Sequence, residues 1–193
     1  ISFNKKLINA YAEPKSVILS FTTHDEVSPV LLHGDDFSVM ICWLESTLPF
    51  NPYSIDGFYT GETYIYPLAN TKAKNTETDD DTYFVHRGKL DIFNFTSKPD
   101  GKNQRIQENF RKAFQFRIDN EKLITEGDFL PLKIVTDNEK IFGYEIMNDN
   151  DSIIVIGNLD FENTIEKVVI KVPKLNKLGK FEIVTGENNL RLK

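Results

Sequence analysis

The stretch SVILSFTTHDE, residues 16–26, decides the fold of this chain. It begins with an apolar, largely β-branched run over 17–19, which predicts a buried strand. The chain then turns polar, and the imidazole of His24 stands beside the carboxyl groups of Asp25 and Glu26. At the end of a buried strand, such a group is typical of the chemistry of α/β enzymes. Alternatively, these are simply the polar residues of a strand that leaves the core and meets water.

Helical spacing of apolar residues flanks this strand on both sides. Residues 3–11 predict a helix, and residues 37–48 predict another with Asp36 or Ser38 as its N-cap. Residues 51–57 predict a short strand that ends at glycine. An order of helix, strand, helix, strand without a hairpin predicts a parallel sheet with right-handed crossovers. Because two strands make a weak sheet, we expect this section to complete a sheet or barrel whose other strands lie elsewhere.

The second half of the chain changes its hydrophobic period. Residues 103–117 predict a helix whose apolar face is Ile106, Phe110, Ala113 and Phe114, with Arg117 in its last turn. From Gly127 the apolar period becomes two, which predicts an antiparallel sheet or sandwich. Its five expected strands are 132–135, 141–146, 152–158, 166–172 and 180–185. We therefore divide the chain into an α/β part, 1–126, and an all-β part, 127–193.

Composition excludes several classes of protein. The chain has 193 residues, of which 40% are hydrophobic, and this argues against disorder. A net charge of −6 disfavours a nucleic-acid surface, so we expect no nucleic-acid partner. No apolar run approaches the ~20 residues of a membrane span, so we expect no membrane partner either. The chain begins at Ile1 without Met or a signal-peptide pattern, so we expect a cleaved leader or a piece of a longer protein, and no compartment is assigned.

The remaining reactive side chains carry no motif. The single cysteine, Cys42, lies in an apolar helical pattern and is expected in the core rather than as a nucleophile. Asp79, Asp80 and Asp81 interrupt a long polar stretch, and we interpret them as a solvated loop because their spacing is not that of a calcium loop. His33 is expected at the surface or behind the site. We predict no metal site and no cofactor.

Several motifs, in order along the chain, resemble the C-terminal portion of the α-amylase family, glycoside hydrolase family 13. Residues 21–25, FTTHD, are similar to the family's barrel-strand motif that ends in His-Asp. Residues 57–62, GFYTGE, resemble the final barrel strand in the maltosyltransferase-type branch. Residues 110–127 are similar to the family's last helix, and Tyr144 with residues 155–159, VIGNL, resembles strands of its C-terminal β-domain.

This resemblance implies a fold and an activity. The fold is the last strands and helices of a (β/α)8 barrel followed by an antiparallel β-sandwich. The family's motif aspartate, which Asp25 matches, stabilises the oxocarbenium-like transition state. The motif histidine, which His24 matches, hydrogen-bonds the same sugar. The nucleophile and the general acid that retaining glycosidases need come from strands that lie upstream of Ile1. The implied partners are an α-glucan or oligosaccharide substrate and the upstream barrel segment, in cis or as a partner chain, and the isolated fragment is expected to be inactive.

Two alternatives stay open. A His-Asp pair also marks metal-dependent phosphohydrolases, although these place the pair on helices with further histidines as ligands. The second alternative is that the chain is a non-catalytic carbohydrate-binding or interaction domain, with an aromatic platform on its all-β part. The aromatic residues for that platform are Phe129, Phe142, Tyr144, Phe161 and Phe181. We expect them in the core, because alternating strands usually bury such side chains.

Overall fold

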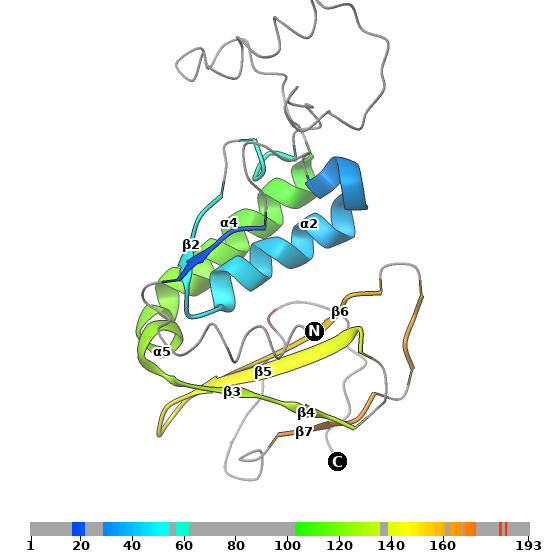
Figure 1. Ribbon diagram of the computed structural model, residues 1–193. Helices are drawn as coiled ribbons and strands as arrows, with labels where there is room; N and C mark the ends of the chain where they lie inside the picture. The colour runs from blue at the N-terminus through cyan, green and yellow to red at the C-terminus, as the bar shows by residue number, and fades with distance from the viewer. Residues whose placement is uncertain are drawn as a thin grey trace, which may run out of the picture.

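The computed structural model describes residues 17–21, 29–54, 57–61, 103–135, 139–160, 163–166, 168–172, 182 and 184. These residues form a mixed α/β structure with three helices and small parallel and antiparallel sheets (Figure 1). Among them no sheet closes into a barrel. Within these ranges no helix is long and apolar enough to cross a membrane.

The predicted parallel strands are present and are joined by a helix. The prediction that the first strand is buried was wrong, since Ile18 is 69% exposed and Val17 and Leu19 are only half-buried. β1 (Ile18–Leu19) pairs in parallel with β2 (Asn51–Pro52), and α2 (Pro29–Thr47) lies between them in the sequence. The amide of Asn51 donates to the Val17 carbonyl at 3.0 Å, and that of Tyr53 donates to the Leu19 carbonyl at 2.8 Å. β2 is shorter than the strand predicted over 51–57. A turn instead occupies 57–61.

The start of α2 differs from the sequence-based expectation. Neither Asp36 nor Ser38 is an N-cap, because helical structure already begins at Pro29. The helix has a kink at Gly34, which adopts a φ of 80°. A glycine takes up this left-handed conformation without the steric cost that a Cβ brings. Ser38 lies one turn beyond the kink, and its hydroxyl donates to the Gly34 carbonyl at 3.0 Å.

Two helices run side by side in the same direction. α4 (Gln104–Asp119) begins at the N-cap Asn103, whose side chain accepts from the Ile106 amide, and Arg117 lies in its last turn as predicted. α2 and α4 lie along each other (Figure 1). Asp36 and Arg105 form an ion pair near their first turns, and Arg117 contacts the C-terminal end of α2. A short helix that was not predicted, α5 (Glu121–Glu126), follows α4.

The antiparallel region begins at the predicted point, after Gly127. The first sheet has the order β3 (Asp128–Pro131), β5 (Ile141–Met147) and β6 (Ser152–Asn158), and β4 (Lys133–Ile134) pairs with β7 (Ile170–Lys171). The strand predicted over 132–135 was wrong in its bounds. Pairing already starts at Asp128. The chain pairs with β5 up to Pro131 and with β7 from Lys133 onward. The strand predicted over 180–185 lies outside the described residues apart from 182 and 184.

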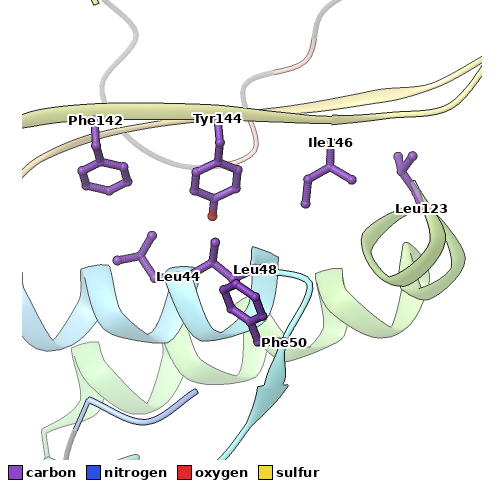
Figure 2. Close-up of a cluster of buried hydrophobic side chains, with 7 residues drawn as sticks. All are labelled: Leu44, Leu48, Phe50, Leu123, Phe142, Tyr144 and Ile146. Carbon is purple, nitrogen blue, oxygen red and sulfur yellow. The ribbon is translucent and has the colours of Figure 1, made fainter. Parts of the chain in front are cut away.

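The core joins the two regions of the chain. One face of β5 directs Phe142, Tyr144 and Ile146 toward α2 and α5 (Figure 2). The complete cluster of buried side chains is Leu44, Leu48, Phe50, Leu123, Phe142, Tyr144 and Ile146. The Phe142 ring lies against Gly157 of β6, where a Cβ would clash with it. Phe142 and Tyr144 are thus core residues, as predicted, and Phe161 and Phe181 lie outside the described residues.

Candidate functional site

The residues predicted for sugar binding and transition-state stabilisation, His24 and Asp25, lie outside the described residues. The described chain follows β1 as far as Phe21 and resumes at Pro29. The run from Asp79 to Asp81 also lies outside. His33 is described and is exposed, as expected, with its ring 4.6 Å from that of Phe37. The described part of the site is the junction at which the ends of β1 and β2 meet.

A buried carboxyl group lies at this junction. Glu45 belongs to the last turns of α2 and is completely inaccessible to solvent. Its Oε2 accepts a hydrogen bond from the Ser54 hydroxyl at 2.5 Å, and the Phe21 backbone hydrogen-bonds the same carboxyl group. Phe21 follows β1 and Ser54 follows β2. One side chain of α2 thus contacts the carboxyl ends of both parallel strands.

Burial governs the protonation of this group. Desolvation raises the pKa of Glu45 to about 7, and the hydrogen bonds from Ser54 and Phe21 offset only part of that rise. Its Oε1 has no hydrogen-bond partner among the described residues. A carboxyl group with such a pKa holds or releases a proton near neutral pH.

Two weakly acidic side chains surround the carboxyl group. Burial, and to a smaller extent the nearby Glu45, raise the pKa of Cys42 to about 12. This thiol is protonated and fully buried, so the prediction of a core cysteine is confirmed. Burial likewise raises the pKa of Tyr59 to about 12, although a hydrogen bond with Ser54 opposes the shift. The Tyr59 ring also stacks on Phe110 of α4, with 3.5 Å between ring centroids.

Arg117 holds the junction between α2 and β2. Its Nη1 donates to the carbonyls of Ser46 and Leu48 at 3.1 and 2.9 Å, and its Nη2 donates to that of Phe50 at 3.0 Å. The carbonyls of a last helical turn have no intrahelical partners, so a cation placed there satisfies them and the helix dipole together. Burial lowers the pKa of Arg117. Its contacts are structural and place α4 against the end of α2.

The antiparallel region has a buried acid of its own. Glu145 of β5 is also inaccessible, and its Oε1 accepts from the Ser152 hydroxyl at 2.8 Å. Its Oε2 has no partner within the described part of the chain. On the other face of β5, the Tyr144 hydroxyl lies 2.7 Å from that of Thr47, and this polar contact connects the sheet to α2.

The arrangement suits holding a polar group or a proton. Within the described ranges, no three side chains of His, Cys, Asp and Glu gather in a way that fits an ion. The sequence analysis missed Glu45, although one signal was present. It interrupts an apolar helical face between Ile41 and Leu48, and an acid in that position is buried unless the helix turns away from the core.

Comparison with known proteins assigns no family. No known family matches the chain, and no curated protein matches it.

Proposed function

We propose that this chain is the C-terminal part of an α-amylase-type glycosidase or transglycosylase that acts on α-glucans. In this proposal Asp25 stabilises the transition state and His24 binds the sugar, while the nucleophile and general acid belong to an upstream segment. The single observation that carries the proposal is the parallel pairing of β1 with β2 through α2, with the His-Asp motif following β1 in the sequence. Barrel enzymes carry their chemistry at this end of their strands.

Two further features support the barrel assignment. α2 and α4 run in the same direction, as successive helices of a β/α repeat do, and they pack on each other. In addition, Ile18 of β1 remains 69% exposed and Tyr53 after β2 remains 52% exposed. A two-stranded parallel sheet with exposed apolar side chains needs further strands beside it. An upstream barrel segment, in cis or as a partner chain, would supply them.

The physical role of each residue follows from charge. As the glycosidic bond breaks, positive charge develops on the sugar, and a carboxylate held beside it stabilises the transition state more than the ground state. Asp25 supplies that carboxylate. His24 donates a hydrogen bond to a sugar hydroxyl and fixes the orientation of the ring.

The alternative is a non-catalytic carbohydrate-binding or interaction domain. The structure argues against an aromatic platform at Phe142 and Tyr144, because these side chains are 2% and 0% exposed and face the helices. Phe129 packs against the same cluster. Side chains buried in this way present no stacking surface to a sugar.

The test is the activity of the protein completed by its upstream barrel segment. We expect cleavage or transfer of maltooligosaccharides, and we expect Asp25→Asn to lower kcat about 10²–10³-fold, the usual loss for one transition-state contact. His24→Ala should lower kcat/KM by about tenfold, because it removes one hydrogen bond to the sugar. Asp36→Asn is the matched control, since Asp36 is exposed and pairs only with the exposed Arg105 among the described residues.

Each other outcome is decisive. A completed protein that leaves maltooligosaccharides intact, or an Asp25→Asn variant as active as wild type, contradicts the proposal. Maltooligosaccharide binding by the present chain, unchanged in Asp25→Asn, supports the alternative. Metal-dependent cleavage of a phosphoester would instead point to a phosphohydrolase.

A further inference from the structure

Glu45 is held in a place where an apolar residue would be easier to bury. Its neighbours on the same helix, Ile41, Cys42 and Leu44, are all buried in the two hydrophobic clusters. Removing a carboxyl group from water costs free energy that hydrogen bonds offset only in part. A buried acid is therefore a costly way to fill this space, which points to a task that its hydrogen bonds perform.

Those hydrogen bonds join three separate segments. The carboxyl group projects from α2, the Phe21 backbone follows β1, and the Ser54 hydroxyl follows β2. β1 and β2 pair over only two residues each, so their own backbone hydrogen bonds define their relative position weakly. The carboxyl group adds a connection directly at the ends of the strands.

We propose that Glu45 is a positioning residue that holds the carboxyl ends of β1 and β2 in one fixed relation for the chemistry at that edge. This inference rests on the proposed function for its consequence in catalysis. Residues that follow β1 contact the sugar in that function, so a shift of the β1 end displaces them from the reacting bond. Misplacement by about 1 Å is enough to cost on the order of 10²-fold in rate.

The groups that face Glu45 come from each element around it. Cys42 lies one turn earlier in α2, and Ser54 and Tyr59 come from the chain that follows β2. From α4, the Arg117 guanidinium lies 3.4 Å from the backbone carbonyl of Glu45. Since Cys42 and Tyr59 are protonated at neutral pH, the carboxyl group is the one that titrates there. Glutamine has the same shape as the protonated acid and keeps an oxygen that accepts from Ser54.

The test compares Glu45→Ala, Glu45→Gln and Ser54→Ala in the protein completed by its upstream barrel segment. The matched control is Glu145→Ala, which removes the other buried acid with a serine partner. We expect Glu45→Ala to lower kcat for maltooligosaccharides about 10–100-fold with KM changed less than about threefold. Glu45→Gln should restore kcat and flatten the pH profile of kcat around neutrality, and Ser54→Ala should cause a smaller loss.

Amide exchange provides a readout that needs no activity. The Asn51 and Tyr53 amides donate across to β1, so Glu45→Ala should speed their exchange at least tenfold more than Glu145→Ala does. If the wild-type completed protein lacks glucan activity but this exchange difference is present, the proposed function fails while the positioning role stands. If the exchange rates are alike in both variants, or if kcat falls equally in both, the positioning role is overturned. Should Glu45→Ala not fold, Glu45→Gln and Ser54→Ala are compared by the same two measurements.

Discussion

The α/β region and the antiparallel region each bury one glutamate against a serine, and the two pairs connect different kinds of element. Glu145 and Ser152 lie diagonally across β5 and β6, whose seven paired residues already define how the strands meet. Glu45 and Ser54 join a helix to the end of a strand that pairs over two residues. We therefore expect the glutamate–serine pair to matter more for the position of the short strands than for that of the long ones.

The two regions also depend on each other for their core. The β5 face that carries Tyr144 packs on the α2 face that carries Leu48 (Figure 2). On its other side α2 packs on α4 through a second buried cluster, to which Ile41, Ile106 and Ala113 belong. Loss of the shared core should thus destabilise both regions together.

The largest expected effect comes from that shared core. Tyr144→Ala removes a completely buried ring from the contact between β5 and α2. We expect it to lower the free energy of unfolding by about 3–5 kcal/mol, measured by urea denaturation with far-UV circular dichroism. Tyr53→Ala, at a half-exposed ring, is the control and should cost much less. Two separate transitions in wild type would show that the regions fold independently and would contradict this expectation.

The buried acid in α2 should give the next largest effect, through pH. Because the pKa of Glu45 is about 7 in the folded protein and about 4.5 in the unfolded chain, the folded state binds the proton more tightly. Its stabilising contribution is complete below pH 4.5 and is lost as the pH rises through 7. The rise from 4.5 to about 7 corresponds to about 3 kcal/mol of unfolding free energy.

The measurement is urea denaturation of wild type and Glu45→Gln between pH 4.5 and 8. Wild type should lose stability relative to Glu45→Gln across this range, because the amide does not ionise. Parallel pH dependences in the two proteins would mean that Glu45 titrates normally. Glu145→Gln, measured alongside, reports whether the acid in the sheet behaves differently from the acid in the helix.

A smaller loss is expected at the end of α2. Arg117→Met keeps much of the side-chain volume but leaves the Ser46, Leu48 and Phe50 carbonyls without this donor. We expect a loss of about 2–3 kcal/mol, typical of hydrogen bonds to a charged group in a partly buried place. Arg105→Met removes an exposed ion pair with Asp36 and should cost less than about 1 kcal/mol. Equal losses in the two variants would contradict a special role for Arg117.

The smallest effect tests the polar contact between the two regions. Thr47→Val removes the hydroxyl that lies beside the Tyr144 hydroxyl, and leaves a buried phenol without this partner. We expect a loss of about 1–2 kcal/mol. The double variant Thr47→Val/Tyr144→Phe removes both hydroxyls and should be more stable than Thr47→Val alone. Strict additivity of the two substitutions would show that the hydroxyls do not interact.

Much of the fold was predictable because it depends on local pattern. The period of 3.6 located α4 to within about two residues, and the period of two located β5 and β6. The start of α2 was not found, since Gly34 and two aspartates indicate a loop and only packing retains helix on both sides of a kink. The change of pairing partner at Leu132, from β5 to β7, was also missed. The alternation of apolar and polar residues is the same whichever strand lies beside the chain.

The candidate site divides in the same way. His24 and Asp25 follow from sequence, through a motif that resembles one family, and they stay predictions. Glu45 emerged only from the structure. Its importance depends on Phe21 and Ser54, which are far from one another in the chain and meet where two strands end.

The sequence by itself determined the order of β1, α2, β2, α4, β5 and β6 and the change of period at Gly127. These properties follow from the apolar and polar character of neighbouring residues, which acts over a few positions. Only the tertiary structure decided which acids lose contact with water and which backbone ends they join. Desolvation and hydrogen bonding depend on atoms brought together from distant segments. For Phe21 those segments are the last turns of α2 and the residues that follow β2.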